Sequence, residues 1–214
     1  MRAHKSAWCA AWVVAFWGLL AGYGYPEPLH TGDIAPDFVL NRFDTTTPVH
    51  LRDLAGQIVV LDFFAYWCGP CKTAASELQP QVQQYYAARG GNPLHVPVQM
   101  ISLSIDGSDQ AATRTYIATY GLDFVLDDSA QTAFTPYSTG FIPRFAIING
   151  VAGANYPQWQ IIFDQVGYGT GNYVTFRNNI DTVVPEPSAI VLLLSGVIVL
   201  LGWKGRRLKG TLCR

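Results

Sequence analysis

The sequence predicts one α/β domain built on a mixed β-sheet. Segments rich in apolar and β-branched residues alternate with segments of helical pattern through the middle of the chain. The last two strand-like segments follow each other without a helix between them, so they are expected to pair and to give the sheet antiparallel strands. The chain between the two apolar terminal segments, residues 25–184, has the length of one domain and can bury a sizeable core.

The expected elements follow in chain order. A small hairpin around residues 44–47 is predicted from the strand-like segments 38–40 and 48–51. The continuous apolar and β-branched run IVVLDFFA at 58–65 is typical of a buried strand. The remaining elements are expected as a helix at 71–88 ended by Gly90 and Gly91, a strand at 96–105, a helix at 108–120, a short strand at 124–126, a strand pair at 145–148 and 160–166, and a helix at 173–182.

Composition and charge exclude two classes of protein. Half of the 214 residues are hydrophobic and only 14% are charged, which excludes a disordered chain. Residues 25–184 carry 7 basic and 14 acidic side chains, a net charge of −7. Binding to nucleic acid requires a cationic surface, so this acidic domain argues against nucleic acid as a partner.

The first 24 residues have the pattern of a secretory signal peptide. Arg2 and Lys5 precede an uninterrupted apolar run at 7–21, and small residues follow at 21–24. The run is short for a permanent span, and retention as a membrane anchor is the alternative. Both interpretations predict that the following domain is exported.

The last 30 residues combine three features in order. Pro185, Glu186 and Pro187 precede an apolar run at 189–203, and basic residues cluster directly after it at 204–207. This segment resembles the PEP-CTERM sorting signal of Gram-negative bacteria. The resemblance implies a helix in the inner membrane before processing, recognition by an exosortase, and delivery to the cell surface or an exopolysaccharide matrix. A plain C-terminal anchor is the alternative. The predicted organisation is a signal peptide (1–24), a domain (25–184) and a sorting segment (185–214).

The predicted domain contains two of the four cysteines, Cys68 and Cys71, in a C-x-x-C spacing. They stand where the predicted strand meets the predicted helix. Cys68 is therefore placed at a helix N-terminus, where backbone N–H groups and the helix dipole stabilise a thiolate. Cys68 is the candidate nucleophile and Cys71 the candidate resolving thiol. Pro70 fits the first turn, because N–H groups there have no intrahelical partner.

Three other interpretations of the cysteine pair are less favourable. A purely structural disulfide would enclose only two residues and would constrain the unfolded chain little. A zinc site needs two further ligands, and the histidines show no paired metal spacing. The peroxidase context Pro-x-x-x-Thr-x-x-Cys is absent from the sequence. We therefore expect no metal, and no cofactor other than the redox-active pair itself.

Around these cysteines the chain resembles the thioredoxin superfamily, in its exported TlpA/ResA-like branch. Residues 62–72 (DFFAYWCGPCK) follow the active-site stretch of the family almost residue for residue. Residues 140–150 (GFIPRFAIING) resemble the loop with a cis-proline before a central strand, and residues 32–38 (GDIAPDF) resemble the entry to the N-terminal hairpin of this branch. The resemblance implies a thioredoxin-like fold, in which helices flank a central mixed sheet and a β-hairpin extends the N-terminus.

The resemblance also assigns roles to individual residues. Asp62 is a carboxylate in an otherwise apolar strand, so its pKa should be raised. In the family the matching group takes the proton of the resolving thiol; a satisfied structural aspartate is the alternative. Pro143 matches the cis-proline, which leaves the backbone of Ile142 to pair with an extended substrate. Trp67 is expected on the docking surface beside Cys68, with a core aromatic as the alternative. The predicted substrate-binding residues are Trp67, Gly69, Pro70, Ile142 and Pro143.

By resemblance the domain is a reductase of protein disulfides. Cys-Gly-Pro-Cys is the thioredoxin motif, and thioredoxin has a potential of about −270 mV, against about −120 mV for the oxidant DsbA. An exported reductant must be recharged in an oxidising compartment. This implies a membrane thiol electron donor of the DsbD/CcdA kind, in addition to disulfide-bearing clients. The alternatives are a periplasmic oxidant or isomerase, a non-catalytic surface or matrix protein on the same scaffold, and a copper carrier.

Overall fold

The computed structural model describes residues 27–185. The predicted signal peptide lies outside the described residues, as do Glu186, Pro187 and the rest of the predicted sorting segment. Pro185 is the last described residue and forms an isolated antiparallel bridge with Ala154. Within residues 27–185 no helix has both the length and the apolar character needed to cross a membrane.

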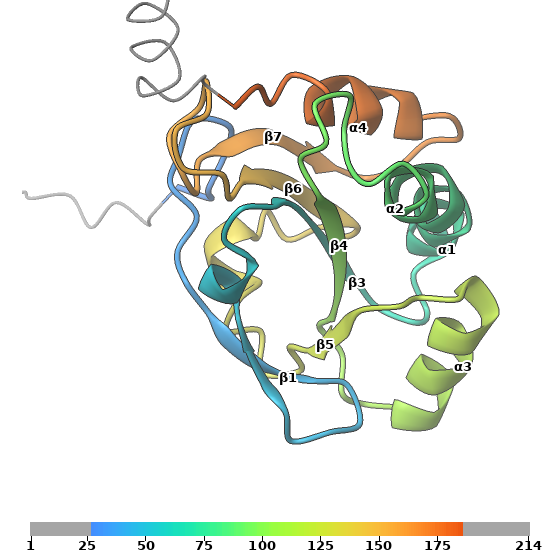
Figure 1. Ribbon diagram of the computed structural model, residues 1–214. Helices are drawn as coiled ribbons and strands as arrows, with labels where there is room; N and C mark the ends of the chain where they lie inside the picture. Colours follow the sequence, from blue (N-terminus) through green and yellow to red (C-terminus); the bar gives the residue numbers. More distant parts are fainter. Residues whose placement is uncertain (1–26, 186–214) are drawn as a thin grey trace, which may run out of the picture.

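Seven strands form one mixed sheet in the order β2-β1-β5-β4-β3-β6-β7 (Figure 1). The central strands β3, β4 and β5 are parallel, whereas β1 pairs antiparallel with both β2 and β5, and β6 pairs antiparallel with both β3 and β7. This confirms the predicted α/β fold and places the N-terminal hairpin at one edge of the central sheet. The strands are β1 Val39–Arg42, β2 Pro48–His50, β3 Ile58–Phe64, β4 Val98–Ser104, β5 Val125–Asp127, β6 Arg144–Asn149 and β7 Ile161–Val166.

The helices gather on one face of this sheet (Figure 1). They are α1 Gly69–Leu78, α2 Tyr85–Ala87, α3 Gln110–Tyr120 and α4 Tyr173–Ile180, and the π-helical segment η2 Gln79–Gln84 joins α1 to α2. The opposite face is covered by the 3₁₀ turns η1 Leu51–Leu54 and η3 Thr135–Tyr137 together with the chain around residues 35–38.

The predicted helix at 71–88 is present, but its start and its regularity differ from the prediction. It begins at Gly69, because the Cys68 sulfur accepts a hydrogen bond from the backbone N–H of Cys71 and so caps the first turn. The helix widens into η2 around Pro80, which has no N–H to donate to the preceding turn. The later helix α3 starts at Gln110 rather than at 108, because Asp109 caps it by accepting a hydrogen bond from the N–H of Ala112.

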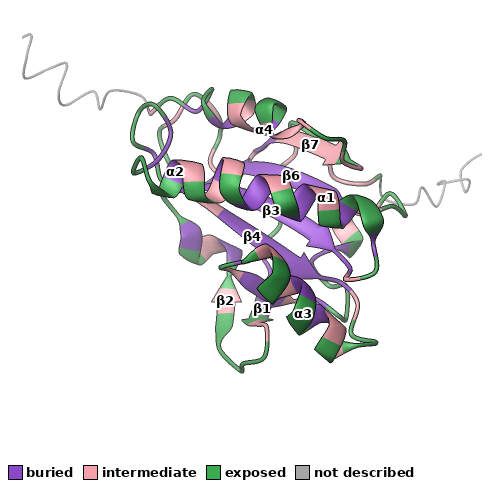
Figure 2. Cartoon of the chain, turned by 90° about the vertical axis from the view of Figure 1, so that its right-hand side faces the viewer, coloured by how far each residue is buried: buried purple, intermediate pink, exposed green. Residues whose placement is uncertain are grey.

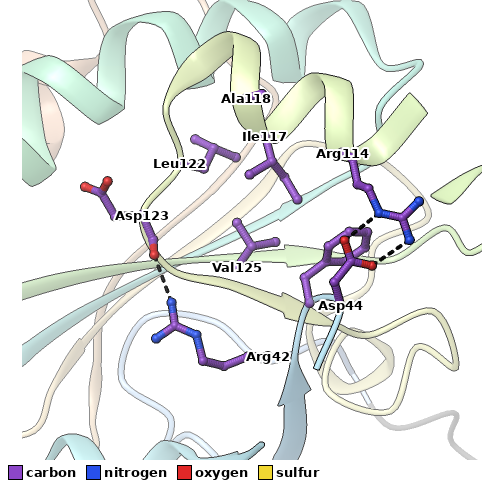
Figure 3. Close-up of a pocket in the computed structure, with 9 residues that line it drawn as sticks. Arg42, Asp44, Arg114, Ile117, Ala118, Leu122, Asp123 and Val125 are labelled. Carbon is purple, nitrogen blue, oxygen red and sulfur yellow. Dashed lines mark hydrogen bonds and ion pairs between the residues drawn. The ribbon is translucent and has the colours of Figure 1, made fainter. Parts of the chain in front are cut away.

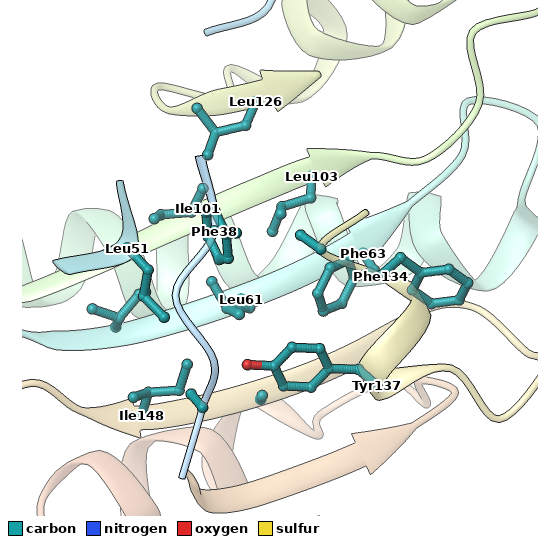
Figure 4. Close-up of a cluster of buried hydrophobic side chains, with 14 of the residues drawn as sticks. Phe38, Leu51, Leu61, Phe63, Ile101, Leu103, Leu126, Phe134, Tyr137 and Ile148 are labelled. Atoms are coloured by element: carbon teal, nitrogen blue, oxygen red, sulfur yellow. The ribbon is translucent and has the colours of Figure 1, made fainter. Parts of the chain in front are cut away.

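The central strand β3 is buried on both faces, as its apolar run predicts (Figure 2). Alternate residues belong to different clusters. Val59, Leu61 and Phe63 pack into the cluster shown in Figure 4, together with η1 and η3. Ile58 and Val60 point to the other face and pack beneath α1 and α4. Residues 62 and 64 share this second face by the two-residue period of a strand, which directs Asp62 toward the helices.

Candidate active site

Cys68 and Cys71 lie at the junction of β3 and α1 and form a disulfide, with their Cα atoms 5.2 Å apart. Cys68 precedes the first helical residue, and Cys71 sits in the first turn of α1. Cys68 retains 4% of its surface exposed, whereas Cys71 is completely buried. A client that approaches from solvent would therefore meet the Cys68 sulfur first.

The first turn of α1 gives this pair an electropositive environment. The N–H of Cys71 points at the Cys68 sulfur at 3.2 Å. Gly69 and Pro70 are the first two helical residues, and Pro70 brings no N–H that would need a partner. In the reduced protein, the helix dipole and these backbone groups would favour a thiolate at position 68.

Asp62 is buried on the helical side of β3, with 1% of its surface exposed. The Ser102 hydroxyl donates a long hydrogen bond of 3.4 Å to Oδ2, and Oδ1 has no hydrogen-bond partner among the described residues. Burial raises the pKa of Asp62 to about 7, and the Ser102 hydroxyl opposes this only in part. A carboxyl group with this pKa can both accept and release a proton near neutral pH.

The peptide bond between Ile142 and Pro143 is cis. Strand pairing places it beside the cysteines: Asp62 lies opposite Phe145 in the β3–β6 register, so the residues just before β6 are level with the end of β3. Ile142 packs, partly buried, against the same cluster as Cys68 and Cys71. The structure thus brings together the two segments that the sequence singled out, although 67 residues separate them.

Trp67 is not a core aromatic, so that alternative is wrong. Its side chain is 58% exposed, and the indole N–H donates a hydrogen bond to Asp106 in the loop after β4. Hydrogen bonds from Ser108 and Trp67 lower the pKa of Asp106, which keeps this carboxylate charged as an acceptor. Phe141 is 68% exposed and directly precedes Ile142.

Sequence reasoning missed several residues around the cysteines. The sequence could have indicated Phe141, because it is a large aromatic residue beside the predicted cis-proline. Nothing in the sequence indicated Ser102 or Tyr116 as site residues. Ser102 is the register partner of Asp62 across the β3–β4 ladder, and the Tyr116 hydroxyl donates to the Cys71 carbonyl at 2.8 Å. Both relations depend on which elements pack together.

A separate pocket of about 270 Å³ opens between β1, α3 and β5 (Figure 3). Its rim carries the ion pair between Arg114 and Asp44, and Arg42 donates to the Asp123 carbonyl at 2.9 Å. Its apolar lining includes Leu122, which also belongs to the cluster that buries the cysteines. Residues 27–185 contain no group of three or more histidine, cysteine or acidic side chains arranged to hold a metal ion.

Comparison with known proteins gives a family and a consistent set of relatives. Residues 31–140, just over half of the chain, match the AhpC/TSA family. The chain is 31% identical over 127 residues to the thiol-disulfide oxidoreductase ResA of Bacillus thuringiensis strain Al Hakam, covering 58% of this chain and 66% of that protein. It is 27% identical over 143 residues to ResA of Bacillus subtilis, covering 66% and 72%. The chain thus spans just under two thirds of the first of these relatives.

Solved structures agree on the fold. A Chlorobium tepidum protein, provisionally described as the thiol:disulfide interchange protein DsbE, superposes with a TM-score of 0.57 at 25% identity, covering 71% of this chain and 96% of that one. The thioredoxin domain of a thiol-disulfide oxidoreductase from Bacteroides vulgatus superposes with a TM-score of 0.56 at 16% identity, covering 71% and 99%. These similarities confirm the thioredoxin-like fold.

Proposed function

This chain belongs to the AhpC/TSA family, and on that premise we propose that it is a thiol–disulfide oxidoreductase of the thioredoxin type. The observation that carries the proposal is the Cys68–Cys71 disulfide at the start of α1, together with a buried carboxyl group on the helical face of β3 that has no cationic partner among the described residues. A scaffold protein needs neither feature. The peroxidase sequence context is absent, so we do not assign peroxide reduction to this member of the family.

The reaction runs through two exchanges. The thiolate of Cys68 attacks a client disulfide, forms a mixed disulfide and releases the first client thiolate. Cys71 then gives its proton to Asp62, and its sulfur attacks Cys68, which closes the intramolecular disulfide and releases the second client thiolate. The client gains two electrons and the cysteine pair loses two. The exposure of Cys68 and the raised pKa of Asp62 support this order and this proton acceptor.

We propose that the direction is reduction of protein disulfides, with clients presented as extended segments. The Gly69–Pro70 dipeptide supports the direction through its resemblance to thioredoxin. By resemblance to the family, the backbone of Ile142 before Pro143 would pair with the client. The 58% exposure of Trp67, next to Cys68 in the sequence, leaves that side chain available to the same client. In the family, a membrane thiol carrier of the DsbD/CcdA kind returns electrons to the pair, and we propose the same donor here.

We further propose that the protein is exported and sorted. Residues 1–24 would direct export to the periplasm of a Gram-negative bacterium. Residues 185–214 would hold the protein at the inner membrane until an exosortase removes the segment and releases the domain toward the surface or matrix. The mass of the protein in the membrane and periplasmic fractions tests these steps. A periplasmic protein that still carries residues 185–214 would overturn removal by an exosortase, and a protein confined to the cytoplasm would overturn export.

The reduction potential of the Cys68–Cys71 couple tests the function. The full chain is equilibrated in glutathione and dithiothreitol buffers while tryptophan emission is followed, and Trp67→Phe is the matched control that identifies the reporting side chain. We expect a potential near that of thioredoxin, about −270 mV. A value near that of DsbA, about −120 mV, would replace the reductase with an oxidant or isomerase. A couple that does not titrate would overturn the enzyme and favour the scaffold.

A further inference from the structure

Tyr116 connects α3 to the first turn of α1. Its side chain is almost completely buried, with 4% exposed, and its hydroxyl donates a 2.8 Å hydrogen bond to the backbone carbonyl of Cys71. No other hydrogen bond joins α1 and α3 within residues 27–185. This hydrogen bond therefore contacts Cys71, the residue whose sulfur attacks Cys68 in the second exchange.

The aromatic ring of Tyr116 is fixed independently of this hydrogen bond. It stacks on Phe64 with ring centres 4.7 Å apart and planes 14° apart. The ring of Tyr120 also contacts it, with ring centres 4.8 Å apart and planes tilted by 58°. Two aromatic contacts thus hold the hydroxyl at one position, so the bond to Cys71 restrains the helix turn as well as satisfying a polar group.

The Tyr116 side chain, which contacts Cys71, also lies near Asp62. Phe64 is two residues after Asp62 on β3, so both side chains lie on the helical face of the sheet. The negative charge of Asp62 contributes to the raised pKa of the Tyr116 hydroxyl, after the larger effect of burial, which agrees with this proximity. Tyr116 therefore spans from the strand that carries the carboxyl group to the carbonyl of the resolving cysteine.

We infer that Tyr116 is a positioning residue for the second exchange. By holding the Cys71 carbonyl it keeps the first turn of α1 in place over β3, so that the Cys71 thiol can pass its proton to Asp62 as its sulfur attacks the Cys68 sulfur. This inference rests on the proposed function. According to this inference, α3 affects the rate at which Cys71 resolves the mixed disulfide. It does not affect the first attack, which is made by the more exposed Cys68.

A two-phase thiol assay separates these steps. Reduced full-length chain carrying Cys9→Ser and Cys213→Ser, purified in mild detergent, is mixed with 5,5′-dithiobis(2-nitrobenzoate). The first nitrothiobenzoate appears as Cys68 forms the mixed disulfide, and the second appears as Cys71 closes the ring. For Tyr116→Phe we expect an unchanged first phase and a second phase slowed about fivefold, the effect of one lost hydrogen bond of ordinary strength.

Tyr120→Phe is the matched control, because it removes a hydroxyl from the same helix and has no hydrogen bond to the cysteine pair among the described contacts. It should leave both phases unchanged. A Tyr116→Phe variant that slows both phases alike, or neither, would overturn the inference. If the unsubstituted pair releases no second nitrothiobenzoate, the proposed function itself fails, and the two failures are thus distinguishable.

Combining Tyr116→Phe with Asp62→Asn tests whether Tyr116 acts through the carboxyl group of Asp62. If Tyr116 acts by keeping Cys71 over the carboxyl group, Tyr116→Phe should slow the second phase less than about twofold in the Asp62→Asn background. A full fivefold loss in that background would show that the two residues act separately, which contradicts the positioning role.

Discussion

Two buried ionisable side chains lie on neighbouring strands but face opposite sides of the sheet. Asp62 of β3 points toward the helices. Arg144 of β6 lies opposite Phe63 in the β3–β6 register and shares the face of that residue, away from the helices. Both are almost completely buried, at 1% and 2% exposure. Their surroundings differ in how completely the polar atoms are paired.

Arg144 is satisfied on every side. It donates to Asp164 at 2.7 Å, to the Leu29 carbonyl at 2.7 Å and to the Tyr137 carbonyl at 3.0 Å. Burial alone would raise the pKa of Asp164, but hydrogen bonds from Thr31 and Arg144 outweigh it and lower that pKa. The Asp164 carboxylate therefore stays charged beside the guanidinium, and the pair joins the N-terminal segment, η3, β6 and β7.

Asp62 shows the opposite case. It has no cation beside it in the described structure, one long hydrogen bond and one unpartnered oxygen, and its pKa rises to about 7. A buried charge is tolerated when it is paired, whereas an unpaired carboxyl group is protonated instead. Completeness of pairing, more than burial, thus separates a structural ionisable group from one that can exchange protons at neutral pH.

The largest expected effect comes from breaking the paired region. Arg144→Met leaves Asp164 without its cation and two carbonyls without their donor. We expect the free energy of unfolding to fall by about 3–5 kcal/mol, as for other buried pairs that lose one partner. Urea denaturation measures it. Arg89→Met, at an exposed arginine stacked on Tyr85, is the control and should change little. A loss below about 1 kcal/mol in Arg144→Met would mean that the pairing of Arg144 contributes little to stability.

Neutralising Asp62 should instead increase the free energy of unfolding. The folded pKa of Asp62, about 7, lies above an unfolded value of about 3.9, so the folded state binds the proton more tightly. Stability therefore falls as pH rises from about 4 to about 7 and is flat above that. Oxidised Asp62→Asn should lack this fall and should be more stable than the parent at pH 8, by about 4 kcal/mol.

Denaturation of both oxidised proteins across this pH range checks the prediction, because other titrating groups contribute equally to each and cancel in the difference. A difference between parent and variant that does not change with pH would mean that Asp62 titrates below the measured range. The same variant should slow the second exchange and leave the first attack intact.

The smallest expected effect concerns the one hydrogen bond that Asp62 does accept. Removing the hydroxyl with Ser102→Ala should raise the pKa of Asp62 further, since Ser102 is the group that opposes burial. The 3.4 Å bond is long, so we expect a shift of only about half a pH unit. The carboxyl signal of Asp62 in an NMR titration, assigned by its loss in Asp62→Asn, measures the shift. A lowered pKa would mean that the hydroxyl favours the protonated form.

Much of the fold was predictable because its signals are local. The apolar run at 58–65, the turn residues of the hairpin and the glycines after the helical stretch each act within a few residues, and the strands and helices formed where these patterns indicated. The motif DFFAYWCGPCK and the stretch GFIPRF identified the segments that meet at the disulfide and the cis peptide. Element ends were less accurate, because caps such as Cys68 and Asp109 depend on one side-chain bond.

The sequence by itself determined the order of the elements, the position of Cys68 and Cys71 at a helix start, and the presence of a carboxylate in a buried strand. Only the tertiary structure decided what surrounds that carboxylate. Ser102 lies 40 residues from Asp62 and Tyr116 lies 45 residues from Cys71, and each arrives through sheet register or helix packing. Likewise, one of the partners that satisfy the Arg144 guanidinium is the carbonyl of Leu29, 115 residues away in the sequence. The physical reason is that patterns in sequence report which face a residue occupies, whereas pKa values and restraints depend on the atoms of other segments that meet it there.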